Sequence, residues 1–74
     1  MKREEISSFE YHANPLDKGK SIRFFRELFS EGKGRFIVED EFTGLNMVCS
    51  SYAFGWQVFS NWVYERCHSP RWEN

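Results

Sequence analysis

The sequence of 74 residues contains little cysteine and proline, and it has no long apolar run. Its two cysteines are too few for a disulfide scaffold, so a reduced, cytoplasmic setting is expected. No apolar run approaches the roughly 20 residues that a membrane-spanning helix needs, and the start, MKREEISSFEY, lacks the apolar core of a secretory signal. We therefore expect one small domain over residues 1–74 and no membrane partner, with flexible tails at 1–5 and 69–74.

Motifs for catalysis and for metal or phosphate binding are also missing. Gly19-Lys20-Ser21 matches the end of a P-loop, but Asn14 stands where that motif requires its first glycine. The acids 39–41 alternate faces in a strand, so they do not converge as a catalytic pair would. The sequence therefore predicts no enzyme activity, no cofactor and no metal site. The possible metal ligands, none of which has a paired C-x-x-C or H-x-x-x-H spacing, are His12, Cys49, Cys67 and His68.

What the sequence does have is aromatic side chains, which make up 19% of the residues. Each buries roughly 150–250 Å² when packed, so a short chain can still form a core. The mean hydropathy is nevertheless −0.64, because the remaining residues are strongly polar. This contrast is typical of a small folded domain and argues against disorder.

Three segments have the alternation or composition of strands. Over residues 6–13, Phe9, Tyr11 and Ala13 share one side, and the Asn14-Pro15 step ends the pattern. Residues 35–40 are rich in strand formers, and residues 45–50 alternate again. Because the connector 41–44 has hairpin length and contains glycine, these last two segments predict a hairpin.

Two segments have helical periodicity. In residues 21–32 the apolar side chains fall on one arc, with Ser21 as the N-cap, Gly32 after the end, and residues 14–20 as a turn. Residues 52–67 predict a second, aromatic helix. The expected fold is therefore α+β, in the order β-α-β-β-α, with two helices packed on a small antiparallel sheet.

The aromatic helix carries more apolar surface than a core requires. Its apolar arc spans about 180°, against roughly 100° for a surface helix. Exposed aromatic residues are typical of protein interfaces. The sequence therefore favours a small non-enzymatic protein that binds another protein, or a second copy of itself as a homodimer, as accessory regulators and inhibitors in mobile elements do. The candidate partner-binding residues are Phe42, Phe54, Val58, Trp62, Tyr64 and Trp72.

The alternative is a nucleic-acid-binding domain. Residues 18–35 hold six basic side chains against two acids, while residues 36–65 hold no Lys or Arg at all. One basic face on the first predicted helix would supply the footprint that nucleic acid requires. An ordinary solvated helix surface, with Glu27 and Glu31 interspersed, explains the same residues. The candidate nucleic-acid-binding residues are Lys18, Lys20, Arg23, Arg26, Lys33 and Arg35.

Overall fold

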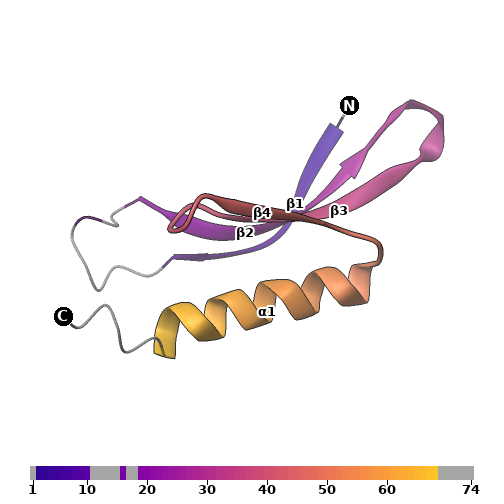
Figure 1. Cartoon of the computed structure of the whole chain (residues 1–74). Helices are drawn as coiled ribbons and strands as arrows, with labels where there is room; N and C mark the ends of the chain where they lie inside the picture. Colours follow the sequence, from indigo (N-terminus) through magenta and orange to yellow (C-terminus); the bar gives the residue numbers. More distant parts are fainter. Residues whose placement is uncertain (1, 11–15, 17–18, 69–74) are drawn as a thin grey trace.

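The computed structural model describes residues 2–10, 16 and 19–68 of the chain. They form one antiparallel sheet, a short 3-10 turn and one long helix (Figure 1). The helix follows the last strand in the sequence. In chain order the elements are β1 (Lys2–Glu10), β2 (Ser21–Leu28), the 3-10 turn η2 (Ser30–Gly32), β3 (Gly34–Asp40), β4 (Leu45–Cys49) and α1 (Tyr52–His68).

The four strands lie in the order β1-β2-β3-β4, so each strand pairs with its neighbour in the sequence. In the register of β2 with β3, Phe24 lies opposite Val38. In the register of β3 with β4, Val38 lies opposite Met47. The helix α1 covers one face of the sheet, and the other face carries no element among the described residues (Figure 1).

The core lies between α1 and the two central strands. Phe24 in β2 is completely buried, and its ring lies 5.2 Å from the Trp56 ring and 6.2 Å from the Phe59 ring, measured between centroids. Gly55 brings the backbone of α1 down onto this ring, because a Cβ atom at position 55 would lie 2.5 Å from Phe24 Cε1. The packing of α1 against the Phe24 ring therefore positions the helix on the sheet.

The predicted order β-α-β-β-α is wrong, because residues 21–28 form the strand β2 and the described residues contain a single helix. The apolar side chains of this segment are divided between two faces of the sheet. Ile22 and Phe24 point to the helix, while Phe25 is buried on the opposite face beside Ile37. A central strand that is buried on both faces carries apolar residues on each of them, and over so short a segment the apolar positions 22, 24, 25 and 28 also fit a helical arc.

The other predicted elements agree better with the structure. The hairpin predicted over residues 35–50 is confirmed as β3 and β4, and the helix over 52–67 is confirmed as α1. Ser51 is the N-cap of this helix, because its Oγ accepts a hydrogen bond of 3.1 Å from the Phe54 amide. The strand predicted at residues 6–13 corresponds to β1, which includes residues 2–5 of the expected N-terminal tail. The tail 69–74 and most of the predicted turn at 14–20 lie outside the described residues.

Within the described residues, no helix is both long and apolar enough to span a membrane.

Candidate functional site

The two edges of the sheet differ in charge. β1 has five charged residues among its nine and a register irregularity between Glu5 and Ser7. Charged residues and bulges are the usual features that prevent an edge strand from pairing with another chain. β4, at the opposite edge, contains no charged residue over its whole length, Leu45–Cys49. Among the described strands, β4 is therefore the edge that is open to pairing.

The side chains of β4 are apolar and largely exposed. Leu45 is 59% exposed, Val48 is 54% exposed and Met47 is 39% exposed. Leu45 and Met47 point to the face that carries α1, because they lie opposite Asp40 and Val38, whereas Val48 points to the opposite face. We refer to Leu45, Met47 and Val48, together with the outward backbone of β4, as the β4 edge.

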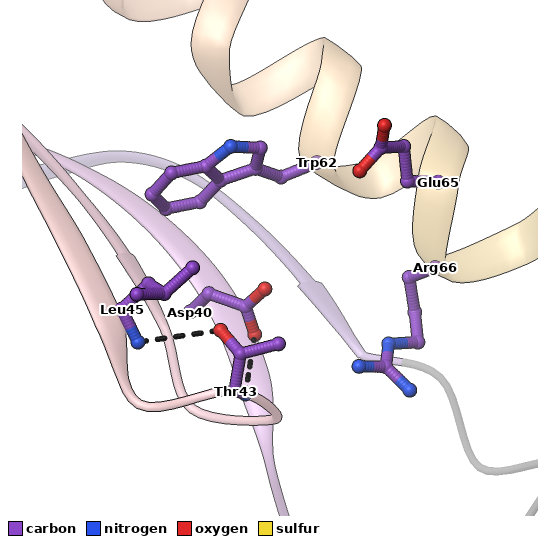
Figure 2. Close-up of a pocket in the computed structure, with 6 residues that line it drawn as sticks. All are labelled: Asp40, Thr43, Leu45, Trp62, Glu65 and Arg66. Atoms are coloured by element: carbon purple, nitrogen blue, oxygen red, sulfur yellow. Dashed lines mark hydrogen bonds between the residues drawn. The ribbon is translucent and has the colours of Figure 1, made fainter. Parts of the chain in front are cut away.

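One side of α1 borders this edge. Trp62 and Glu65 line a cavity with Leu45, so their side of the helix faces β4 (Figure 2). Phe54 and Val58 belong to the same side, since steps of three and four residues return to nearly the same angle of a helix. Val58, a predicted partner-binding residue, is buried in the core, but Phe54 is 40% exposed. Phe54 thus extends the apolar surface from the β4 edge onto the helix.

The cavity lies between the last turns of α1 and the turn that connects β3 to β4. Its volume is about 80 Å³, and Figure 2 shows its walls. Ligand pockets for small molecules are typically 300–1,000 Å³, so this cavity has room for one side chain rather than for a cofactor. The residues that line it are Asp40, Thr43, Leu45, Trp62, Glu65 and Arg66.

Hydrogen bonds fix the floor of the cavity. Asp40 accepts one hydrogen bond of 2.8 Å from the Phe42 amide and another of 3.3 Å from the Thr43 amide. The guanidinium of Arg66 lies 4.4 Å above the Phe42 ring, where a cation–π contact holds it. The Nε atom of Arg66 is buried without a hydrogen-bond partner among the described residues. Of the residues predicted to bind a partner, Trp62 is therefore a half-buried wall of the cavity, and Phe42 is half-buried beneath Arg66.

The remaining predicted partner-binding residues lie elsewhere. Tyr64 is 63% exposed, and its ring stacks on His68 with a centroid separation of 4.1 Å. It follows Phe54 by ten residues, which is about 15 Å along a helix. Trp72 lies outside the described residues. The structure thus separates Tyr64 from the apolar surface that Phe54 and β4 share.

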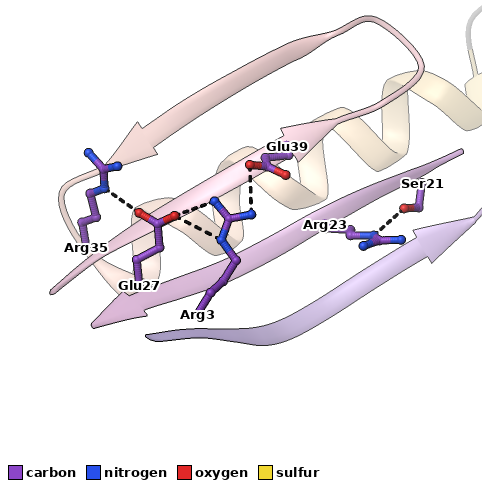
Figure 3. A network of polar contacts seen from close by, with 6 residues as sticks. All are labelled: Arg3, Ser21, Arg23, Glu27, Arg35 and Glu39. Atoms are coloured by element: carbon purple, nitrogen blue, oxygen red, sulfur yellow. Dashed lines mark hydrogen bonds and ion pairs between the residues drawn. The ribbon is translucent and has the colours of Figure 1, made fainter. Parts of the chain in front are cut away.

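A polar network covers the sheet face opposite to α1 (Figure 3). The Glu27 side chain is only 2% exposed, and its two oxygens accept hydrogen bonds from Arg3 Nε at 3.1 Å and from Arg35 Nε at 2.8 Å. Arg3 also lies 3.4 Å from Glu39 and covers the Phe25 ring at 4.5 Å. This network joins β1, β2 and β3 on the face opposite to α1.

The hydrogen bonds from Arg3 and Arg35 hold the pKa of the Glu27 carboxyl below its ordinary value. A carboxyl whose pKa is lowered by folding stabilises the fold above its unfolded pKa of about 4.5, and that contribution is lost as the pH falls through the folded pKa. We expect Glu27→Gln to lower the free energy of unfolding by roughly 1–2 kcal/mol at neutral pH, since both arginines are half-exposed. The loss should shrink as the pH falls below about 4.5.

Urea unfolding at a series of pH values measures this effect. The matched control is Glu4→Gln, because Glu4 is 44% exposed and its contacts with Lys2 and Arg26 are both 3.9 Å long. The control should change the stability by less than about 0.5 kcal/mol. Equal losses for the two variants, or a Glu27→Gln loss that does not depend on pH, would contradict the structural role of the network.

The predicted basic face is divided by the strand. Arg23 and Arg26 would be neighbours on a helix, but in β2 an odd separation places them on opposite faces of the sheet. Arg35 pairs with Glu27, and Arg26 lies 3.9 Å from Glu4. Lys20 is half-buried, Lys33 is exposed beside η2, and Lys18 lies outside the described residues. The described residues therefore do not gather the predicted basic set on one surface.

The three consecutive acids at the end of β3 and the start of the following turn each have a structural contact. Glu39 pairs with Arg3, and Asp40 holds the turn that follows β3. Glu41 accepts a hydrogen bond of 2.8 Å from the Ser21 amide and thereby joins the start of β2 to the end of β3. The contacts account for these acids as parts of the fold.

Sequence reasoning missed the β4 edge. The composition of residues 45–49, which are uncharged, was a usable signal, but the strand order needed to identify an edge depends on β2 being a strand.

Comparison with models of known protein families, with curated proteins and with solved structures finds no match for this chain.

Proposed function

We propose that this chain is a small non-enzymatic interaction protein, of the accessory or regulatory kind, that binds another protein along the β4 edge. The observation that carries the proposal is an uncharged strand with three exposed apolar side chains, whose outer edge pairs with no other strand among the described residues. In β-augmentation, such an edge supplies backbone hydrogen bonds to an extended segment, and its side chains supply specificity.

Two neighbouring features support the proposal. Phe54 on α1 enlarges the apolar surface beside β4, and aromatic residues are enriched where interfaces are fully buried. The cavity beyond Leu45 has the size of one side chain and combines the Trp62 ring with the charges of Asp40 and Arg66. An extended segment on β4 could place one of its side chains there.

Selection from displayed random peptides tests the proposed function. Peptides selected on dilute protein should be extended and apolar, and titrating them into isotope-labelled protein should shift the NMR signals of residues 45–49 and Phe54. Met47→Lys should abolish their binding, whereas Ser60→Lys, on an exposed part of the same molecule, should not. Peptides that bind Met47→Lys as tightly as the wild type, or that shift only signals of β1, would contradict the proposal.

Phe54→Ala separates binding from folding. Because Phe54 is 40% exposed and lies outside the core cluster, its loss should cost less than about 1 kcal/mol of stability while weakening peptide binding. The matched control is Phe59→Ala in the same helix, where a 7% exposed ring predicts a loss of about 3–5 kcal/mol. Thermal unfolding together with peptide titration measures both quantities. If Phe54→Ala destabilises the protein as much as Phe59→Ala, Phe54 belongs to the core and not to the binding surface.

A further inference from the structure

The proposed function leaves the partner open, and the β4 edge has the properties of a surface that pairs with itself. We propose that its partner is a second copy of this chain, with the two β4 strands antiparallel across a two-fold axis beside Met47. This inference rests on the proposed function and adds the identity of the partner. A two-fold axis makes such an interface from one self-complementary patch on each copy.

The register follows from the length of β4. With the axis beside Met47, this residue lies opposite its own copy, Leu45 lies opposite Cys49 of the second copy, and Asn46 lies opposite Val48. All five residues of the strand are then paired, and no charge lies opposite a like charge. The β1 edge is less suited to such pairing, because it would bring five charged residues into the interface and its register with β2 is irregular.

The acids that precede β4 favour the antiparallel arrangement. The acids 39–41 lie at the end of β3 and the start of the connecting turn, whereas Ser50 and Ser51 follow the strand. Antiparallel pairing about Met47 places the acidic segments at opposite ends of the interface, so that each approaches the uncharged end of the other strand. Parallel pairing would place the two acidic segments side by side, where like charges repel each other.

The side chains on the helix face also fit a second copy. Paired antiparallel strands keep the same face of each sheet on the same side, so both copies of α1 would lie on one face of an eight-stranded sheet. Met47, which α1 of its own chain leaves exposed, would then contact Met47 of the second copy, and the exposed Leu45 would lie opposite Cys49 and diagonal to Met47 of that copy. On the bordering side of α1, Phe54 and Val58 are apolar. The charged residues there, Glu65 and Arg66, lie near the end of the helix, so their two copies would lie at opposite ends of the interface.

Five residue pairs form a small interface. Stable complexes typically bury about 800 Å² on each partner, and a short edge with one exposed phenylalanine provides less than a large obligate dimer does. We therefore expect a dimer that forms and dissociates with concentration. Its dissociation constant should respond strongly to charge at Met47, because this residue faces its own copy.

Sedimentation velocity over a concentration series tests the pairing, with the wild type, Met47→Lys, Met47→Glu and an equimolar mixture of these two variants. The wild type should dimerise, and each variant alone should dissociate with a constant raised on the order of 100-fold, since like charges would be juxtaposed. The mixture should dimerise again, because Lys then faces Glu. Ser60→Lys is the matched control and should dimerise as the wild type does, and circular dichroism should show all variants folded.

Each other outcome overturns this inference in a recognisable way. If the Met47→Lys variant dimerises by itself, self-association occurs through another surface. A wild type that is monomeric at every concentration but binds selected peptides at β4 would remove the second copy as the partner and leave the proposed function standing. A monomer that binds no peptide would remove both. If neither variant dimerises by itself but their mixture does, Met47 is identified as a residue that faces its own copy.

Discussion

Phe24→Ala is expected to lower the free energy of unfolding by about 3–5 kcal/mol, the usual cost of deleting a buried phenyl ring. The stability of a chain of this length is roughly 4–11 kcal/mol in total, so this one change removes a large part of it. Phe24 is fully buried, and its ring contacts aromatic side chains on both β3 and α1. These side chains are Phe36, Tyr52, Trp56 and Phe59.

Urea unfolding measures the loss, and Phe29→Ala is the matched control. Phe29 directly follows β2 and is 38% exposed, and the Arg35 guanidinium lies 5.5 Å from its ring. Its removal should cost less than about 1 kcal/mol. Similar losses for the two variants would mean that Phe24 is not the centre of the core, and the packing of α1 on β2 would then be wrong.

Gly55→Ala is expected to destabilise the protein by about 1–3 kcal/mol, although alanine is the better helix former. In an exposed helix the same change would stabilise by roughly 1 kcal/mol. At this position the added Cβ atom would lie 2.5 Å from Cε1 and 2.6 Å from Cζ of Phe24, and the surrounding core holds that ring in place. The close approach of α1 to β2 therefore outweighs the intrinsic preference of the residue.

A double-mutant cycle isolates this contact. Shortening the ring with Phe24→Leu removes the atoms that the new methyl group would meet, so Gly55→Ala should cost less in that background than in the wild type. Ala53→Gly, at an exposed position of the same helix, measures the helix preference without the contact. If Gly55→Ala stabilises the wild type by about as much as Ala53→Gly destabilises it, α1 does not approach Phe24 closely.

The helix and the hairpin were predictable because their signals are local. Residues 52–67 repeat at the helical period over four turns, and the connector 41–44 contains Gly44, whose φ of 80° suits glycine in a tight turn. β2 has no such local signal. Its identity depends on partners at a distance in the sequence, namely β1 and β3, and its apolar residues serve two faces of a sheet.

The wrong prediction of a helix over residues 21–32 also changed where the candidate site residues were expected to lie. With residues 21–32 as a helix, Arg23 and Arg26 share a surface, whereas in a strand they lie on opposite faces. The same error concealed the edge, because β4 becomes the end of a four-stranded sheet only when β2 joins β1 to β3. The expectation of an apolar surface near the aromatic helix remains a prediction. In the structure the exposed aromatic residue beside this surface is Phe54, which lies on the side of α1 that borders β4.

The most direct test of β4 as the binding edge is amide hydrogen exchange, resolved by residue, in dilute and in concentrated protein. Exchange reports whether a backbone amide is hydrogen-bonded, and an open edge leaves alternate amides of its strand exposed to water. The predicted result is that outward-facing amides within residues 45–49 exchange rapidly in dilute protein and slow with concentration, while those of β1 do not change. Slow exchange of all β4 amides at every concentration, or slowing that appears in β1 instead, would contradict an interaction edge at β4.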